Sequence, residues 1–251
     1  MKILIELPTW LGDCVMATPA IENIVNFDND VQITFIGSFV AIEAMKNHLK
    51  VVKTVVLDKK YGVLYKTARN LGEFDYFFSF RSSLRTKFLK FLISAKNKYQ
   101  FDKNKYQHRH QVEKYNDFIN DSLDINFPAG KLLLSTISSQ SSTQKTVGIN
   151  PGASYGSAKR WYPEEFAKVA SELSDRYDIV IFGGPGEVDI ALDIEKLLIK
   201  KDVKNYKNLA GKTTIPELIN HISNLDLFIT GDSGPMHVAA AFEVPTVAIF
   251  G

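Results

Sequence analysis

Short apolar runs alternate with amphipathic segments along the whole chain, and this alternation restricts the fold more than any other feature. In the first half, the pattern predicts strands at 3–7, 31–36, 51–57 and 74–80, and helices at 14–27, 63–71, 84–93 and 111–123. Buried strands that alternate with helices indicate a parallel sheet covered on both faces. The first half is therefore expected to form an α/β domain.

A polar segment at 135–144, rich in Ser, Thr and Gln, interrupts the alternation and is typical of a linker. Beyond it, strands are predicted at 146–150, 179–182, 227–230 and 246–250, and helices at 163–174, 187–199, 215–224 and 235–242. We therefore predict two Rossmann-like, doubly wound domains, 1–140 and 141–251, with a ligand cleft between them. The chain stops directly after a strand, so we expect residues to be missing from this end.

The composition is that of an ordinary globular protein, with 45% hydrophobic and 23% charged residues among 251. The sequence has no apolar stretch of about 18 residues and no signal-peptide pattern, so we expect a cytoplasmic protein without a transmembrane helix. Cys14 is the single cysteine. It cannot form an internal disulfide, which fits a reducing compartment.

The net charge of +2 conceals a basic stretch between Arg81 and Lys114, in which ten lysines and arginines face only Asp102 and Glu113. Such a field attracts anions, for instance a phosphorylated acceptor, an acidic lipid surface or nucleic acid. The alternative is a solvated, lysine-rich face without a specific partner.

The loop at 8–13 follows the first predicted strand and carries Gly12, which permits a tight turn, and Asp13. Two interpretations of Asp13 stay open. Its carboxylate either accepts backbone N–H bonds as the N-cap of the next helix or acts as a general base at the cleft. The helix dipole and these N–H bonds predict a lowered pKa for Asp13.

Two loops of the second domain combine small residues with charge. The loop at 150–163 offers the Ser154 hydroxyl and the cations Lys159 and Arg160, which could neutralise a diphosphate. A surface loop anchored by a packed Trp161 is the alternative. The glycines at 183–186 could let a nucleotide lie against the backbone, with Glu187 or Asp189 on ribose hydroxyls, although a plain turn explains them equally well.

The loop at 230–237 begins a predicted helix with Asp232, Ser233 and Gly234, so backbone N–H groups and the helix dipole would point at a phosphate. Asp232 or Ser233 could instead cap the helix. His237, about one turn further on, is either a phosphate partner or a packing residue. Thr213 and Thr214 are caps or the rim of a pocket for a nucleotide base.

Several chemistries lack their sequence patterns. There is no Walker A motif and no G-x-S-x-G elbow, and the five scattered histidines with one cysteine offer too few ligands for a structural zinc site. The Asp-x-Asp pattern at 28–30 lies in a polar turn and is interpreted as a surface turn.

Taken together, the four loops resemble the ADP-heptose–lipopolysaccharide heptosyltransferases, glycosyltransferase family 9, and most closely the members that add the second heptose. The resemblance rests on LPTWLGD at 7–13 with PAI at 19–21, PGA at 151–153, AKRW at 158–161, NLAGKT at 208–213 and DSGPMHVAAA at 232–241. It implies a GT-B fold with an N-terminal acceptor domain and a C-terminal nucleotide-sugar domain.

The resemblance also implies an inverting transfer of heptose from ADP-L-glycero-β-D-manno-heptose to the inner core of lipopolysaccharide, without metal or other cofactor. Asp13 is the implied catalytic base. The implied donor-binding residues are Ser154, Lys159, Glu187, Thr213, Asp232, Ser233, Gly234 and His237. Arg81 and Arg85 are expected at an anionic acceptor built on Kdo, heptose and lipid A. The implied location is the cytoplasmic face of the inner membrane, in peripheral contact and without nucleic acid.

Three alternatives remain at the level of sequence. A transferase of the same family could use another heptose or core position. A dehydrogenase or epimerase on a dinucleotide-binding fold is disfavoured because the first strand is not followed by G-x-G-x-x-G. A non-catalytic module that binds a nucleotide or lipid A is disfavoured by the presence of Asp13 together with all four loops.

Overall fold

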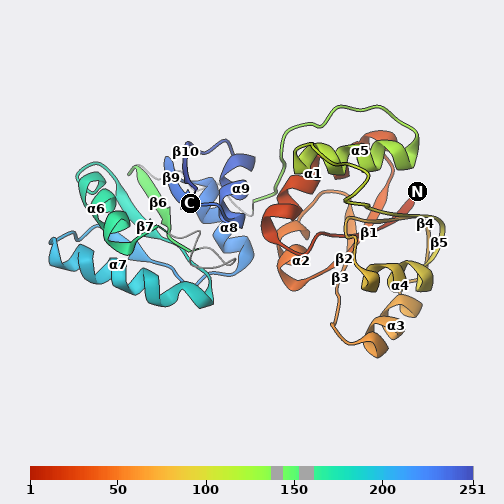
Figure 1. Cartoon of the computed structure of the whole chain (residues 1–251), viewed down its shortest axis with the longest axis horizontal. Helices are drawn as coiled ribbons and strands as arrows, with labels where there is room; N and C mark the ends of the chain where they lie inside the picture. Colours follow the sequence, from red (N-terminus) through yellow and green to blue (C-terminus); the bar gives the residue numbers. More distant parts are fainter. Residues whose placement is uncertain (137–143, 153–160, 251) are drawn as a thin grey trace. The chain divides into compact units, whose positions relative to one another are not determined.

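The computed structural model describes residues 1–136, 144–152 and 161–250. Contacts between Cα atoms divide the chain into two compact units, Met1–Ser135 and Thr136–Gly251. Each unit contains a five-stranded parallel sheet with helices on both faces (Figure 1). This architecture confirms the predicted pair of doubly wound α/β domains.

The first unit has the strand order β3-β2-β1-β4-β5. Its strands are β1 (Lys2–Glu6), β2 (Gln32–Gly37), β3 (Val51–Val56), β4 (Glu73–Ser79) and β5 (Ser94–Gln100). Helices α1 (Leu11–Phe27) and α5 (Gln111–Leu123) pack together on one face, with α2 (Phe39–Met45) against α1. Helices α3 (Tyr61–Asn70) and α4 (Leu84–Leu92) pack together on the other face (Figure 1).

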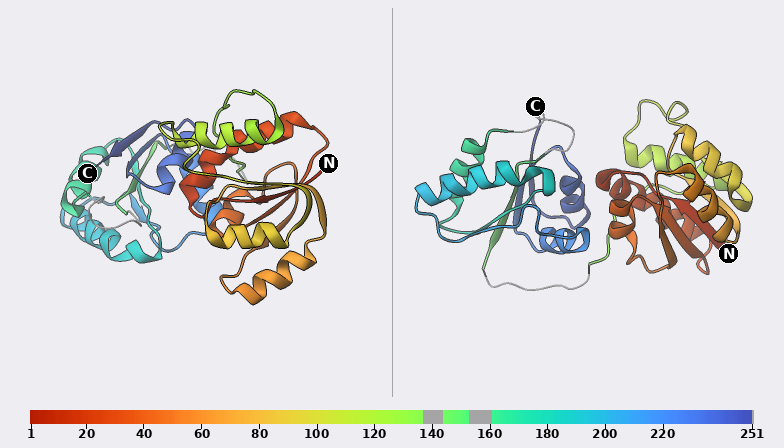
Figure 2. Two further views of the ribbon diagram at one scale, coloured as in Figure 1. Left: turned by 45° about the vertical axis from the view of Figure 1, so that its right-hand side comes forward. Right: turned by 90° about the horizontal axis from the view of Figure 1, so that it is seen from below.

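The second unit repeats this topology with the order β10-β9-β6-β7-β8. Its strands are β6 (Thr146–Asn150), β7 (Asp178–Ile181), β8 (Tyr206–Asn208), β9 (Leu227–Gly231) and β10 (Thr246–Ile249). Helices α6 (Pro163–Leu173) and α7 (Val188–Lys200) cover one face, with a short 3₁₀ turn at Pro185–Glu187 before α7. Helices α8 (Ile215–Ser223) and α9 (Gly234–Ala241) cover the other face (Figure 2).

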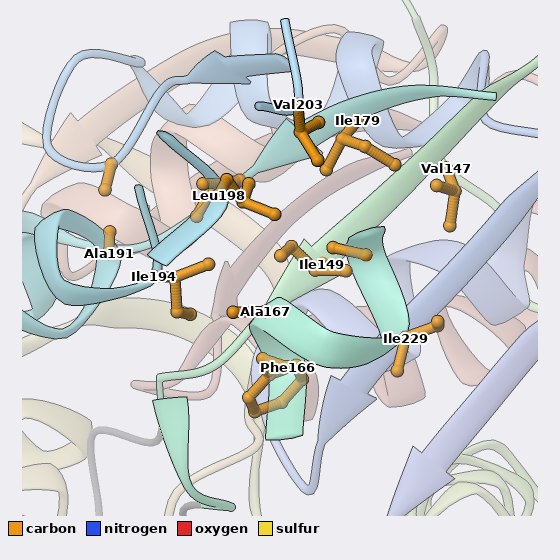
Figure 3. Packing of buried hydrophobic residues seen from close by; sticks show 13 residues of the cluster. Val147, Ile149, Phe166, Ala167, Ile179, Ala191, Ile194, Leu198, Val203 and Ile229 are labelled. Atoms are coloured by element: carbon orange, nitrogen blue, oxygen red, sulfur yellow. The ribbon is translucent and has the colours of Figure 1, made fainter. Parts of the chain in front are cut away.

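The core of the second unit shows why its central strand is apolar on both faces. Val147 and Ile149 point from β6 into a cluster that includes Phe166 of α6 and Ile194 of α7 (Figure 3). Full burial of each such side chain contributes roughly 1.5–3 kcal/mol. On the other face, a Cβ at Gly148 would meet Leu225, Phe182 and Phe228 at 2.5–2.9 Å, so only glycine fits there.

Three elements were not predicted: α2, β5 and β8. Helix α2 is a single seven-residue segment, and β5 is a polar edge strand whose sequence, SAKNKYQ, lacks an apolar run. Most of the predicted linker lies outside the described residues. In the described part of the chain, no helix combines the length and apolar character needed to cross a membrane.

In both sheets the direction of strand addition reverses beside the first strand. The reversal lies between β1 and β4 in the first unit and between β6 and β9 in the second. At such a switch point the flanking loops turn to opposite faces of the sheet. This leaves a crevice at the carboxyl ends of the strands, which is where open α/β sheets bind ligands. The predicted site residues can therefore be located relative to these two crevices.

Candidate active site

Asp13 lies in the first turn of α1, which starts at the carboxyl end of β1 beside the first switch point. The N-cap is Trp10, whose side chain makes no capping bond, and Asp13 is the third helical residue. The interpretation of Asp13 as the cap is therefore wrong. Among the described residues, no hydrogen bond or ion pair reaches its half-buried carboxylate.

The pKa of Asp13 shifts in the direction opposite to the prediction. Burial raises the pKa of this carboxyl above its ordinary value. The prediction was wrong because it counted the helix dipole and backbone N–H bonds but could not count the loss of solvent. A raised pKa lies closer to neutral pH, and this makes the carboxylate a better general base.

A buried polar cluster, absent from the sequence predictions, lies at the same switch point. Glu6 ends β1, is 1% exposed, and accepts a hydrogen bond of 2.6 Å from the Ser79 hydroxyl at the end of β4. Its other oxygen is 3.4 Å from both Arg81 Nη1 and Thr86 Oγ1. Burial raises the pKa of Glu6, whereas Ser79, Arg81 and Thr86 oppose that shift.

The two predicted acceptor cations follow β4 at this edge of the sheet. Arg81 is held by the ion pair with Glu6 and retains 23% exposure of its side chain. Arg85 donates to the backbone carbonyl of Asp58, while its Nε is buried and has no hydrogen-bond partner among the described residues. The first switch point thus has a partly exposed arginine side chain and a half-buried carboxylate.

In the second unit, Asn150 connects the loops on both sides of the second switch point. It ends β6, is buried, and donates from Nδ2 to Thr230 Oγ1 and to Ser233 Oγ, each at 3.2 Å. Thr230 and Ser233 share a further hydrogen bond of 3.1 Å. This amide therefore fixes the β6 loop against the loop that begins α9.

The start of α9 contains four of the predicted donor residues. Ser233 is the N-cap residue, but its side chain makes no capping bond because it faces Asn150 and Thr230. Gly234 is the first helical residue, Asp232 precedes the cap, and His237 lies about one turn further on; each is half-buried. Binding of an anion by the N–H groups and dipole of this helix start remains a prediction.

Glu187 joins the β6 and β7 loops. Its Oε2 accepts a hydrogen bond of 2.7 Å from the Gly184 N–H, and its carboxylate lies so close to Gly152 that a Cβ there would overlap it. The glycines of these loops thus permit a carboxylate to lie against backbone at the carboxyl edge of the sheet. An interaction of Glu187 with a ribose remains a prediction.

Thr213 and Thr214 have different roles in the structure. Thr214 is the N-cap of α8: its hydroxyl accepts from the Glu217 N–H, while Glu217 accepts from the Thr214 N–H at 2.8 Å. Thr213 is half-buried and precedes this cap. Gly211 adopts a positive φ of 70° and donates to the Gly183 carbonyl at 2.9 Å, which brings the Thr213 loop beside the β7 loop.

Ser154 and Lys159 lie outside the described residues, as does Arg160. The alternative role for Trp161 is supported, because its ring packs edge-on against Phe166 at the second core, with 5.2 Å between ring centroids. Within the ranges that the structure describes, no group of three or more His, Cys, Asp or Glu side chains could hold a metal ion.

Sequence reasoning missed Glu6, Asn150 and Thr230. Glu6 carried a usable signal, since a carboxylate inside an apolar strand needs a partner when buried. Asn150 and Thr230 are the first residues of two loops that were singled out, 150–163 and 230–237, but were given no role. Their contact needed knowledge that β6 and β9 are neighbours.

Comparison with known proteins gives consistent results. The model of the family "Glycosyltransferase family 9 (heptosyltransferase)" matches residues 79–251. Lipooligosaccharide heptosyltransferase 2 of Campylobacter jejuni serotype O:2 is 43% identical over 261 residues, covering 100% of this chain and 81% of that protein. Lipopolysaccharide heptosyltransferase 2 of Escherichia coli K12 is 37% identical over 114 residues, covering 45% and 33%.

Solved structures share the fold. E. coli ADP-heptose LPS heptosyltransferase II superimposes with a TM-score of 0.86 at 22% identity, covering 100% of this chain and 85% of that one. The family 9 glycosyltransferase of Veillonella parvula gives a TM-score of 0.85 at 23% identity, covering 98% and 79%. At these identities the likeness shows the fold, which is the two-domain GT-B type.

Proposed function

Since the chain belongs to glycosyltransferase family 9, the heptosyltransferase family, we propose that it moves a heptose from ADP-L-glycero-β-D-manno-heptose to the inner core of lipopolysaccharide as the second heptose. The observation that carries the proposal is the similarity, over this entire chain, to relatives named heptosyltransferase 2. The geometry of the two switch points supports it, because the first carries the proposed base and the second carries the proposed diphosphate site.

Asp13 is the proposed base. As an acceptor hydroxyl oxygen attacks C1 of the heptose, its proton passes to the Asp13 carboxylate. The bond between C1 and the diphosphate oxygen breaks with inversion, and the electron pair leaves with ADP. Half-burial and the raised pKa support this role, since a more basic carboxylate accepts a proton more readily.

The second unit is proposed to hold the donor. The N–H groups at Ser233 and Gly234 stabilise the charge that develops on the diphosphate, in a loop already fixed by Asn150. Lys159 and Ser154 are proposed to complete the diphosphate site, with Asp232 and His237 near the donor. Glu187 and Thr213 are proposed for ribose and adenine, from the adjoining β7 and β8 loops.

The first unit is proposed to hold the acceptor, an anionic saccharide built on Kdo, heptose and lipid A. The side chain of Arg81 is partly exposed next to the first switch point, and its ion pair with Glu6 fixes its position. Arg85, whose Nε lacks a partner within the described residues, is the second proposed contact. We further propose that the reaction needs no metal or other cofactor and that the enzyme works in peripheral contact with the inner face of the inner membrane.

A nucleotide titration tests the donor and the mechanism together. ADP, UDP, GDP and NAD are titrated into the protein by calorimetry, each with and without EDTA. Preferential binding of ADP that survives EDTA supports a metal-independent ADP-sugar transferase. Preference for UDP, or loss of ADP binding in EDTA, contradicts the donor or the mechanism, and preference for NAD would favour the dehydrogenase alternative.

A transfer assay then tests the acceptor. Lipopolysaccharide acceptors that end before the first, second or third heptose are offered with ADP-heptose, and product formation is followed by mass spectrometry. The proposal expects transfer to the acceptor that carries one heptose. Transfer to another of these acceptors would contradict the assignment to the second heptose while leaving the reaction class intact.

A further inference from the structure

Helices α3 and α4 lie side by side on one face of the first sheet (Figures 1 and 2). Together they expose six large apolar side chains. Leu84 and Phe91 of α4 are 80% and 81% exposed. The exposed apolar residues of the two helices, here called the α3–α4 surface, are Tyr61, Val63, Tyr65, Leu84, Phe88 and Phe91.

The pattern on α4 has a second apolar stripe besides the one that reaches the core. Leu89 is buried in the cluster beneath the helix, and Thr86 is buried one turn earlier. Leu84, Phe88 and Phe91 follow the i, i+4, i+7 spacing of one helical face, and that face is exposed. The Phe88 ring meets Tyr61 of α3 edge-on, with 5.5 Å between centroids, so the apolar residues continue from one helix to the other.

The same helices carry only positive charge. Segments 59–71 and 84–101 contain no acidic residue. The cations that flank the apolar residues are Lys59, Lys60, Lys66, Arg69, Lys87 and Lys90. Within the described residues, none of these six forms an ion pair, and Arg69 instead lies over the ring of Tyr65.

Several other cations of the basic stretch differ in this respect. Lys105 pairs with Asp121 at 2.6 Å, and Arg109 pairs with Asp117 at 2.9 Å. Lys96 pairs with Asp75 at 2.7 Å. These three cations are paired within the protein, whereas the six around α3 and α4 leave their positive charge available to an external partner.

We propose that the α3–α4 surface docks the enzyme on an anionic lipid bilayer, with its aromatic and leucine side chains in the headgroup region and its cations against lipid phosphates. This proposal deepens the peripheral membrane contact of the proposed function and rests on it. Interfacial helices combine Lys and Arg with Phe, Leu and Trp in this way. The cores of protein–protein interfaces are instead depleted in lysine, which argues against a protein occupant.

The test measures partitioning of the full chain onto sucrose-loaded vesicles in 50 mM salt. One set contains phosphatidylglycerol and phosphatidylethanolamine, and the other contains phosphatidylcholine alone. The wild type is expected to partition onto the anionic vesicles and to be released by 500 mM salt, because screening weakens contacts between exposed charges. Leu84→Ser with Phe91→Ser, and separately Lys87→Glu with Lys90→Glu, are each expected to lower the partition coefficient by about tenfold or more.

Matched controls change equally exposed residues elsewhere. Leu49→Ser replaces a leucine that is 94% exposed, and Lys200→Glu with Lys204→Glu reverses two exposed lysines of the second unit. These variants are expected to partition like the wild type. Thermal unfolding of every variant checks that the fold persists, and ADP titration reports on the proposed function independently of vesicles.

Three results would overturn the proposal. The wild type could fail to bind anionic vesicles while binding ADP normally. The controls could lose as much partitioning as the α3–α4 variants. Finally, sedimentation without vesicles could reveal a dimer that Leu84→Ser with Phe91→Ser dissociates, which would identify a second copy of the chain as the occupant.

Discussion

Asn150 Nδ2 donates a hydrogen bond of 3.2 Å to Thr230 Oγ1, joining β6 to β9 across the switch point of the second sheet from positions 80 residues apart in the chain. The same amide reaches Ser233 at the start of α9. Its position therefore couples the stability of the second unit to the geometry of the proposed diphosphate site.

Asn150→Ala is expected to cost about 1–3 kcal/mol of unfolding free energy, because Thr230 and Ser233 each lose a hydrogen bond from a buried amide. It should also weaken ADP binding by about tenfold, since the Ser233 loop loses its anchor. Urea unfolding and calorimetry measure the two effects. Asn205→Ala is the control. Asn205 Nδ2 likewise donates two hydrogen bonds, to the carbonyls of Ser174 and Tyr177, but it lies just before β8, at the amino ends of the strands. Equal loss of ADP affinity in both variants would exclude a local role for Asn150.

Gly152→Ala is expected to weaken ADP binding because the new Cβ would overlap the Glu187 carboxylate and displace it from the Gly184 N–H. A loss of about tenfold is expected. Gly186→Ala, in the same group of loops, adds a Cβ that meets nothing within 4 Å and should leave the affinity unchanged. Isothermal titration with ADP compares the two; equal affinities would refute a role for the Glu187 position in donor binding.

Asp13→Ala is expected to reduce heptose transfer by about 10²–10⁴-fold, the range associated with a general base, while ADP binding stays nearly intact. The measurements are a direct transfer assay and calorimetry. Glu22→Gln removes a carboxylate from the same helix, where Glu22 contacts His48 at 2.7 Å, and should leave transfer unchanged. Turnover of Asp13→Ala near the wild-type rate would show that another group accepts the proton.

The pH dependence of kcat/KM should carry the signature of Asp13. Because burial raises the pKa of this carboxyl, protonation inactivates the base at a higher pH than that of an ordinary aspartate, about 3.9. Activity is therefore expected to fall on the acid side with a midpoint above that value. A pH–rate profile, limited to the range in which circular dichroism shows a folded protein, measures the midpoint. An acid limb at or below that value would mean that the titrating group is solvated.

Glu6 should make the stability of the first unit depend on pH. Its folded-state pKa is raised, so between the ordinary value, about 4.3, and the raised value the folded state binds more protons than the unfolded state. The stabilising contribution of Glu6 is thus complete below the ordinary pKa and is lost as the pH rises through the folded-state pKa. Urea unfolding of the wild type and Glu6→Gln across this range measures the difference, which should decline with rising pH; an increase would contradict the assignment.

The alternation of apolar and amphipathic segments was sufficient to predict both α/β domains, because strand and helix formation in a buried parallel sheet depends on local patterns. The prediction of β6 at 146–150 matches the observed strand, and that of α5 at 111–123 matches the helix. The alternation did not predict β5, since an edge strand buries too little of its sequence to require an apolar run.

The loop motifs likewise determined the family, because contiguous residues carry that signal. Only the tertiary structure decided how the loops interact. Glu6 contacts Ser79 because β1 and β4 are neighbours in the first sheet. Likewise, Asn150 contacts Thr230 because β6 and β9 are neighbours in the second. The local sequence of each strand does not specify which strand lies beside it. The tertiary structure also decided the direction of the Asp13 pKa shift. The sequence places Asp13 at the start of a helix, where the dipole lowers the pKa, but burial depends on segments far away in the chain and raises it.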